Sequence, residues 1–203
     1  MKIICIGRNY VDHIRELNNA IPGEPVFFLK PDTALLIRNR PFFYPSFSTD
    51  IHYELELVLK ISKVGKHIQK QFASTYFDEI GLGLDMTARD LQESAKKKSL
   101  PWAVAKGFDQ SAPIGRFISK NMFSDFRNIN FHLNLNGKNV QNGNSGLMIY
   151  SFEDIISQIS RYMTLRTGDL IFTGTPAGVG PVKIGDVLEG YIEGERILKC
   201  EIK

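Results

Sequence analysis

The chain has 203 residues, of which 43% are hydrophobic and 23% charged, and its 25 basic and 22 acidic side chains give a formal net charge of +3. This apolar content excludes an intrinsically disordered protein. The small net charge argues against a dedicated nucleic-acid-binding protein, because it creates no strong basic field. At this length we expect one domain that spans residues 1–203.

The two cysteines lie near opposite ends of the chain and belong to no CxxC pair or zinc-ligand spacing. We expect Cys5 and Cys200 to be buried apolar thiols in a reducing compartment. The N-terminus has only four consecutive apolar residues, too few for a secretory signal, and no stretch approaches the length of a membrane span. These features predict a cytoplasmic protein without membrane contact, with a trimmed organellar form left open.

The first third of the chain predicts strands on either side of one short helix. The segment Lys2–Ile6 is short and β-branched, and the helix that follows begins after Asn9, which we expect to cap it. Because the next residues are rich in Asn, Pro and Gly, we interpret residues 9–25 as a lid segment. Further strands are expected at Val26–Leu29, Ala34–Ile37 and Tyr53–Ile61.

The rest of the chain predicts two longer helices among many strands. One helix is expected over Thr87–Lys97 with Thr87 as its cap, and the pattern Ser151-x-x-Asp154 opens the other. Strands are expected at Ile80–Leu84, Ile129–Leu135, Leu170–Thr173, Val187–Ile192 and Ile197–Ile202. Because no alternating βαβ rhythm is present, this order favours an α+β fold that is mostly antiparallel β with a few helices.

Two glutamates alternate with apolar residues in the segment Tyr53–Leu59. The two-residue period of a strand places Glu54 and Glu56 on one face and the apolar side chains on the other, which we expect to face the core. Neighbouring carboxylates inside a cleft repel each other, and a divalent cation would relieve that cost. Taken alone, the segment also fits an amphipathic edge strand whose glutamates face water.

A third carboxylate, that of Asp85, follows the apolar run Ile80–Leu84 and precedes a predicted helix. It is well placed to be a third ligand, although a helix cap or turn residue is the alternative. The sequence has no HExxH, HxH or CxxC motif, so a zinc or soft-metal site has no support. An all-oxygen ligand set favours Mg²⁺ or Mn²⁺ and leaves positions for water and a chelating substrate.

Two further features suit an anionic substrate. Lys106 is the one basic residue in the apolar and aromatic stretch Leu100–Phe108, although a lysine there also fits a side chain that extends to the surface. The glycine-rich loop 173–181 offers backbone N–H groups and hydroxyls that can hold a carboxylate. Its glycines equally fit a tight turn, and its spacing excludes a Walker phosphate loop.

His13 and Glu16 are i and i+3 neighbours on the first predicted helix. We interpret them as an acid/base dyad in which Glu16 orients the imidazole and His13 takes a proton from water. A pair on the protein surface is the alternative. The basic run Lys96–Lys98 is interpreted as a solvated helix end, and the absence of a GxSxG motif argues against a serine hydrolase.

These segments, in this order, resemble the fumarylacetoacetate hydrolase family over nearly the whole chain. The matching stretches are Gly7-Arg8-Asn9-Tyr10 with His13 and Glu16, Leu29-Lys30-Pro31, Tyr53–Leu57, Leu84–Asp90, Ala105-Lys106, and Thr173–Pro176 with Gly178–Gly180. The stretch from Leu84 to Asp90, followed by Lys-Lys-Lys and Leu-Pro-Trp, is most similar to the short acylpyruvase and oxaloacetate decarboxylase subgroup.

The resemblance implies a mixed β-sandwich roll with a few peripheral helices, which assembles as a homodimer. It implies that Mg²⁺ or Mn²⁺ is held by the carboxylates of Glu54, Glu56 and Asp85. It implies that the helix carrying His13 and Glu16 closes over the substrate and that both residues are catalytic. It also implies that Lys106 approaches the carbonyl chemistry and that Gln92 helps to orient water. The substrate contacts that it implies are Arg8, Lys30 and Thr175.

We therefore expect a metal-dependent enzyme that cleaves a C–C bond in a small-molecule 2-oxo acid through a metal-stabilised enolate. The reaction would be the hydrolysis of an acylpyruvate, the decarboxylation of oxaloacetate, or both. An isomerase or decarboxylase of 2-hydroxyhepta-2,4-diene-1,7-dioate-type diacids is one alternative. A non-catalytic module that binds 2-oxo acids is another, but it explains the paired glutamates poorly, since carboxylates without chemistry gain nothing from burial.

Overall fold

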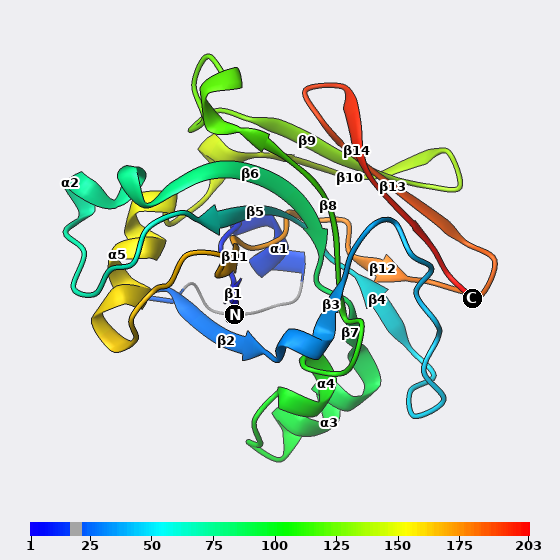
Figure 1. Ribbon diagram of the computed structural model, residues 1–203. Helices are drawn as coiled ribbons and strands as arrows, with labels where there is room; N and C mark the ends of the chain where they lie inside the picture. Colours follow the sequence, from blue (N-terminus) through cyan, green and yellow to red (C-terminus); the bar gives the residue numbers. More distant parts are fainter. Residues whose placement is uncertain (17–21) are drawn as a thin grey trace.

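The computed structural model describes residues 1–16 and 22–203 and consists mainly of curled β-sheets (Figure 1). The largest sheet has seven strands. In spatial order they are β2 (Val26–Lys30), β1 (Ile3–Gly7), β11 (Leu170–Phe172), β5 (Leu55–Ile61), β6 (Phe77–Leu84), β8 (Ala112–Ser119) and β3 (Leu35–Leu36). Most neighbours are antiparallel, whereas β1 with β11 and β3 with β8 are parallel.

Two smaller sheets and five helices complete the described part of the fold. The four-stranded sheet contains, in spatial order, β10 (Lys138–Asn144), β9 (Asn130–Leu135), β13 (Val187–Ile192) and β14 (Glu195–Glu201). The three-stranded sheet contains β12 (Gly180–Pro181), β4 (Ile51–Tyr53) and β7 (Thr87–Ala88). The helices are α1 (Val11–Glu16), α2 (Lys70–Ala73), α3 (Arg89–Lys97), α4 (Ala103–Lys106) and α5 (Phe152–Tyr162), and short 3-10 turns lie at Asp32–Ala34, Ser74–Tyr76, Lys120–Met122 and Ser145–Leu147.

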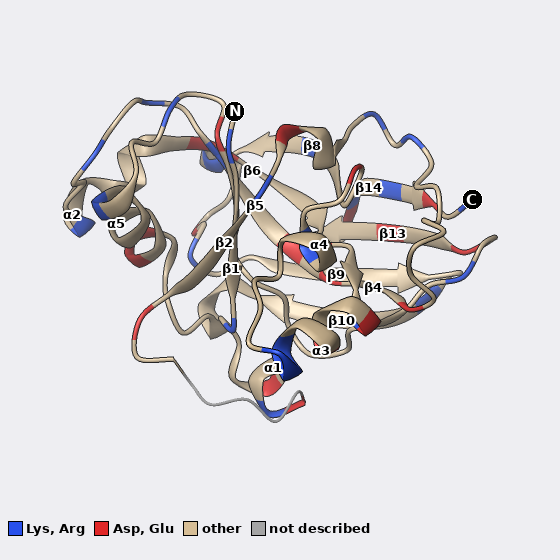
Figure 2. Cartoon of the chain, turned by 90° about the horizontal axis from the view of Figure 1, so that it is seen from below, with Lys and Arg blue, Asp and Glu red and all other residues tan. Residues whose placement is uncertain are grey.

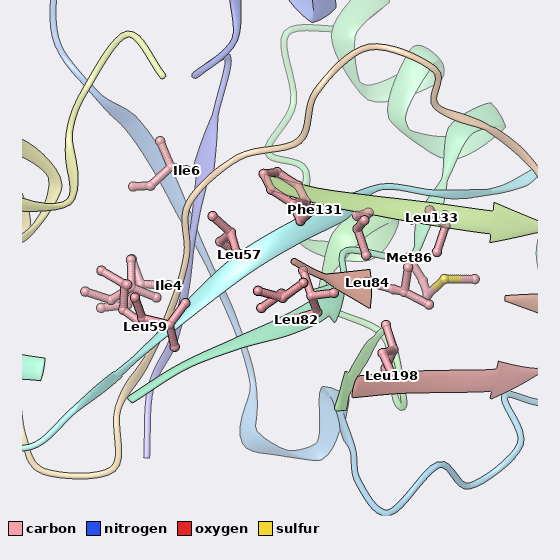
Figure 3. Close-up of a cluster of buried hydrophobic side chains, with 14 of the residues drawn as sticks. Ile4, Ile6, Leu57, Leu59, Leu82, Leu84, Met86, Phe131, Leu133 and Leu198 are labelled. Atoms are coloured by element: carbon pink, nitrogen blue, oxygen red, sulfur yellow. The ribbon is translucent and has the colours of Figure 1, made fainter. Parts of the chain in front are cut away.

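The main hydrophobic core lies between the seven-stranded and four-stranded sheets, and Figure 3 shows part of it. Leu57 of β5 and Leu82 of β6 pack there in one cluster with Phe131 of β9 and Leu198 of β14. Each fully buried side chain of this size contributes roughly 1.5–3 kcal/mol to folding. Because the odd-numbered residues of β5 face this core, its even-numbered residues face the other side of the sheet.

A second, smaller cluster covers part of that other side. Val58 packs there with Ile3, Cys5 and Phe172. Gly83 of β6 allows the close approach, since an added Cβ would lie 2.4 Å from the ring of Phe172. The cluster covers the middle of β5, and the glutamates lie beyond it toward the strand's start.

Several sequence predictions are confirmed and several need correction. The Ser151 and Asp154 capping box is present at the start of α5, and both cysteines are buried and free. The strand expected over Tyr53–Ile61 is interrupted at Glu54, so Tyr53 belongs to β4 in another sheet. The strand expected at Ala34–Ile37 shortens to Leu35–Leu36, because a 3-10 turn occupies the residues before it.

Two predicted helix caps are wrong for the same reason, which is that the side chain bonds elsewhere. Thr87 lies in β7, and its hydroxyl bonds to the carbonyl of Asp85 and to the ammonium of Lys106, while α3 begins at Arg89 without a side-chain cap. The side chain of Asn9 bonds instead to backbone groups of Tyr150 and Thr173. Both side chains connect segments that are distant in sequence and do not cap the start of a helix.

Part of the predicted lid, residues 17–21, lies outside the described residues. Of the remainder, α1 is the segment that carries His13 and Glu16. Within residues 1–16 and 22–203, no helix combines the length and the apolar character needed to cross a membrane.

Candidate active site

Three buried carboxylates meet where β5 begins and β6 ends. The antiparallel register pairs Leu55 with Leu84, which brings Glu54 opposite Asp85, and the backbone N–H of Asp85 donates to the carbonyl of Glu54 at 2.8 Å. One ligand oxygen from each of Glu54, Glu56 and Asp85 lies within 4.8 Å of the others, and each residue is at most 6% exposed. The alternative of an edge strand whose glutamates face water is therefore wrong.

Buried cations contact two of these carboxylates. The ammonium of Lys106 lies 2.8 Å from both Glu54 and Asp85, and Arg89 donates to Glu54 at 2.7 Å. Lys30 lies 2.7 Å from the Oδ1 of Asp85. Glu56 differs, because it accepts a 2.6 Å hydrogen bond from the backbone of Gly174 and has no ion pair within the described part of the chain.

These contacts give the two glutamates opposite charge preferences. Burial raises the pKa of Glu56, and the negative charges of Asp85 and Glu54 raise it further. Burial would also raise the pKa of Glu54, but Lys106 and Arg89 hold that pKa well below its ordinary value. Burial alone would lower the pKa of Lys106, which Asp85 and Glu54 instead raise. The site therefore holds Lys106 in its charged form, and the carboxyl of Glu56 lacks a cation that would favour its charged form.

The donor set fits a hard divalent cation. All three groups present carboxylate oxygens, the ligands that Mg²⁺ and Mn²⁺ prefer. The Oδ1 of Asp85 is fully buried and accepts no hydrogen bond from residues 1–16 or 22–203, although Lys30 lies beside it. Glu56, which has no ion pair among the described residues, is the carboxylate that a bound cation would neutralise, so Glu54, Glu56 and Asp85 would hold the ion.

The triad lines a pocket that collects most of the residues expected from the sequence. Those on its wall are Arg8, His13, Glu54, Glu56, Asp85, Gln92, Lys106 and Thr175. Glu16 is not on this wall but contacts His13, which is. The ammonium of Lys30 is fully buried and bonds to the carbonyls of Met86, Lys106 and Ser111 and to the Ser111 hydroxyl. Lys30 is therefore placed to fix Asp85, and its contact with a substrate remains a prediction.

Within the His13 and Glu16 pair, the histidine is buried and the glutamate is exposed. His13 is 6% exposed, and its Nδ1 lies 3.2 Å from the carboxylate of Glu16. The same carboxylate accepts from the backbone N–H of Gly178 at 3.1 Å. Glu16 therefore fixes both the imidazole of His13 and the position of α1 against the loop 173–180. Because the contact with Glu16 uses Nδ1, the Nε2 of His13 is the ring nitrogen left for another partner.

Comparison with known proteins agrees with this geometry. The family model described as Fumarylacetoacetate (FAA) hydrolase C-terminal matches residues 2–203. The chain belongs to the fumarylacetoacetate hydrolase family. The resemblance inferred from the sequence motifs is thereby confirmed.

Relatives of known name support the assignment to this family. The chain is 47% identical over 194 residues to the mitochondrial oxaloacetate decarboxylase of Dictyostelium discoideum, covering 95% of this chain and 89% of the relative. It is 43% identical over 201 residues to the mitochondrial oxaloacetate tautomerase of Bos taurus, covering 99% and 91%.

A solved structure shares the fold. The fumarylpyruvate hydrolase of Pseudomonas aeruginosa, in complex with Mn²⁺ and pyruvate, has a TM-score of 0.94 and 37% identity, covering 100% of this chain and 89% of that one. The predicted fold class, mostly β with few helices, is confirmed. Several features of this family member's site were nevertheless not expected from its sequence.

Arg89 is one site residue that the sequence analysis did not identify. Its two terminal nitrogens donate to Glu54 at 2.7 Å and to the Oε1 of Gln92 at 2.6 Å. This fixes the amide of Gln92 so that its NH₂ group is left to donate elsewhere. The i, i+3 spacing of Arg89 and Gln92 on α3 was the signal that could have identified the pair.

Gln141 is another, and it reaches the site from the four-stranded sheet. Its Oε1 accepts from the backbone N–H of Leu55 at 2.9 Å, and its NH₂ group donates to the hydroxyl of Thr175 and the carbonyl of Pro176, each at 2.9 Å. Because the Thr175 hydroxyl accepts from Gln141, its own hydrogen is available to another acceptor. No local pattern reveals this residue, since Leu55 lies 86 positions away.

Proposed function

We propose that this family member is a Mg²⁺- or Mn²⁺-dependent enzyme that breaks a C–C bond in a 2-oxo acid through an enolate. The observation that carries the proposal is the buried triad of Glu54, Glu56 and Asp85, which faces a pocket beside Lys106 and His13. The names of the relatives support the substrate class, because oxaloacetate and fumarylpyruvate are both 2-oxo acids.

The chain's own groups supply positive charge and position. A bound divalent ion would act as a Lewis acid toward the 2-oxo group and carboxylate of the substrate. Lys106, fixed by Glu54, Asp85 and Thr87, places its ammonium where negative charge develops on the enolate oxygen. Thr175 would donate to a substrate oxygen, and Arg8 would contact a substrate carboxylate.

Water is needed for only one of the proposed reactions. In the hydrolysis of an acylpyruvate, His13 would take a proton from water, with Glu16 stabilising the imidazolium and Gln92 orienting the water. The attack on the distal carbonyl then releases pyruvate and a carboxylic acid. In oxaloacetate the enolate arises by loss of CO₂, which needs no water nucleophile.

Proton transfer on the same enolate is the second candidate. The bovine relative is named an oxaloacetate tautomerase, and tautomerisation interconverts the keto and enol forms without breaking a C–C bond. The same pocket groups would stabilise the enolate, and His13 or Lys106 would exchange the proton. The isomerisation of a dienoic diacid belongs to this class of chemistry too.

A panel of substrates separates these reactions. Purified protein with and without Mn²⁺ would be given acetylpyruvate, oxaloacetate and a 2-hydroxyhepta-2,4-diene-1,7-dioate, while pyruvate, CO₂ and enol absorbance are followed. We expect Mn²⁺-dependent pyruvate release from at least one of the first two compounds. Loss of enol absorbance without pyruvate would instead assign a tautomerase, and turnover of the dienoic diacid alone would assign an isomerase.

A binding measurement tests the non-catalytic alternative. Oxalate resembles the enolate of pyruvate, so it should raise the melting temperature only when Mn²⁺ is present. Such a shift without turnover of any compound would support a binding module. No shift and no Mn²⁺ uptake by calorimetry would contradict the proposal altogether.

Two further expectations belong to the same proposal. Light scattering tests the homodimer that the resemblance implied. The sequence predicted a cytoplasmic protein and left a trimmed organellar form open, whereas the relatives from Bos taurus and Dictyostelium discoideum are named as mitochondrial. Cell fractionation with antibodies against the protein distinguishes the two compartments.

A further inference from the structure

The basic run at the end of α3 is exposed, but one of its lysines also lines the pocket. Lys96 lies in the last turn of that helix, and its side chain lines the same pocket as the carboxylate triad. All three lysines of the run are exposed, but Lys97 and Lys98 are not on that wall. Lys96 and Lys97 lie in the last turn of α3, whereas Arg89 begins that helix, which packs beside α4 (Figure 2). One of three adjacent lysines therefore faces the pocket.

Arg8 is a second cation on this wall, and its backbone conformation is unusual. Its φ angle of +61° lies in the left-handed region, which non-glycine residues adopt only at a cost. Gly7 precedes it and packs near the ring of Trp102, since an added Cβ would lie 4.0 Å from that ring. The turn at Gly7 and Arg8 therefore lies beside the aromatic wall of the pocket.

Among the residues that the structure describes, neither cation has an acidic partner. In the described ranges 1–16 and 22–203, no ion pair involves Arg8 or Lys96, whereas Lys30, Arg89 and Lys106 all contact carboxylates. Burial lowers the pKa of Lys96, and the positive charges of Arg89 and Arg8 lower it further. The ammonium of Lys96 thus lies among other cations, and an anion bound there would relieve their repulsion.

Two aromatic rings separate this region from the triad. The ammonium of Lys106 lies 5.4 Å from the ring centre of Phe28, and Phe28 contacts Trp102 edge-on with their ring centres 6.1 Å apart. The ammonium of Lys96 lies 5.8 Å from the ring centre of Trp102. The pocket therefore has a carboxylate-rich end, an apolar middle and a basic end, which we call its mouth.

We propose that Arg8 and Lys96 form a subsite for a second carboxylate on the substrate, so that the pocket selects dicarboxylic 2-oxo acids over those with an uncharged tail. This inference rests on the proposed function, because the first carboxylate and the 2-oxo group are assigned to the triad end. At the inner end Glu54 and Asp85 already contact Lys30, Arg89 and Lys106, whereas the two positive charges at the mouth have no carboxylate partner among the described residues and are available to the ligand. Charge at the far end of the substrate then decides its affinity.

Lys96 and Lys97 provide a matched pair of variants. Lys96→Met and Lys97→Met remove the same charge from the same exposed helix end, but only Lys96 reaches the pocket. A charge-assisted contact is stronger than a hydrogen bond between neutral groups, but exposure to solvent weakens it. We expect Lys96→Met to lower the ratio of kcat/KM for oxaloacetate over acetylpyruvate by about 10-fold, mostly through KM. Lys97→Met should leave the ratio within about 2-fold of wild type.

A binding experiment tests the subsite without turnover. The Mn²⁺-loaded protein would be titrated by calorimetry with 2-oxoglutarate and with 2-oxopentanoate, which has the same chain length but no distal carboxylate. We expect wild type and Lys97→Met to prefer 2-oxoglutarate, and Lys96→Met to lose about 10-fold of that preference. High salt should reduce the preference in wild type, because the mouth is open to solvent.

The outcomes separate the two proposals. If wild type turns over both substrates but Lys96→Met and Lys97→Met keep the same selectivity, the subsite is overturned and the proposed function stands. If wild type turns over neither substrate, the proposed function fails. The subsite is then tested by the calorimetric preference for 2-oxoglutarate over 2-oxopentanoate. If wild type also binds neither 2-oxo acid, both proposals fail. Equal melting temperatures of the two variants would exclude a folding defect.

Discussion

At the inner end of the pocket, Glu54 and Asp85 contact buried cations, whereas Arg8 and Lys96 at the mouth have no acidic partner among the residues described. The inner charges are out of water, so the chain itself must compensate them. The mouth is partly solvated and can keep surplus charge for a ligand. Substitutions inside should therefore change stability and metal affinity, and those at the mouth should change selectivity alone.

The largest effects should separate Glu54 from Glu56, which lie two residues apart on one face. Glu54→Gln breaks a buried network with Lys106 and Arg89 and should lower the free energy of unfolding by about 3–5 kcal/mol. Glu56→Gln replaces a buried carboxyl that has no cation partner among the described residues and can keep the bond from Gly174, so the metal-free protein should be at least as stable as wild type. Calorimetry should show that both variants lose most Mn²⁺ affinity. A destabilised Glu56→Gln would contradict this account of the inner end.

The dyad should distinguish hydrolysis from decarboxylation. His13→Ala removes the proposed base for water and should lower kcat on acetylpyruvate by about 10²–10⁴-fold. Decarboxylation of oxaloacetate, which uses no water nucleophile, should fall much less. Glu16→Gln serves as the milder variant, because it keeps a hydrogen-bond acceptor for Gly178. Equal losses of both activities would count against the dyad as the activator of water.

Gln141 should connect stability with substrate affinity, unlike the residues at the mouth. In Gln141→Glu the carboxylate cannot donate to the carbonyl of Pro176, and that buried mismatch should cost about 1–3 kcal/mol. Movement of the Thr175 loop should also raise KM, by about 10-fold. Asn142→Asp, the same change at the exposed neighbour, is the control and should alter neither quantity. Chemical denaturation and steady-state kinetics measure the two effects.

The smallest expected effect is a proton released when the metal binds. The pKa of Glu56 is raised in the folded protein, so this carboxyl takes up a proton on folding, and its contribution opposes folding as pH rises from its ordinary pKa toward the raised one. A bound cation favours the charged form, so Mn²⁺ affinity should increase with pH across that window, with release of up to about one proton. Calorimetry in buffers of different ionisation enthalpy counts the proton. Glu56→Gln should abolish this release.

Local patterns in the sequence were sufficient for the parts of the site that lie on one strand or one helix. The alternation of Glu54 and Glu56 with leucines placed both carboxylates opposite the core, and the i, i+3 spacing paired His13 with Glu16. The spacing Ser151-x-x-Asp154 located the start of α5. In each case the partners are close in sequence, so backbone geometry alone brings them together.

Contacts between segments that are distant in the chain could not be predicted from local sequence patterns. Thr87 and Asn9 have the chemistry of helix caps, but tertiary bonds to Lys106 and to Thr173 use their polar atoms instead. Gln141 gives no local signal, because its three partners belong to other elements. Lys96 is exposed, as its interpretation as part of a solvated helix end predicted, but only the packing of α3 shows that it also lines the pocket.

The position of β11 also bears on how the protein is made. This strand lies between β1 and β5, yet its residues Leu170–Phe172 leave the ribosome more than 100 residues after β5 has emerged. Until then the apolar edges of β1 and β5 are unpaired, and such edges are prone to aggregation. Newly synthesised chains should therefore depend on chaperones until the last quarter of the sequence has emerged.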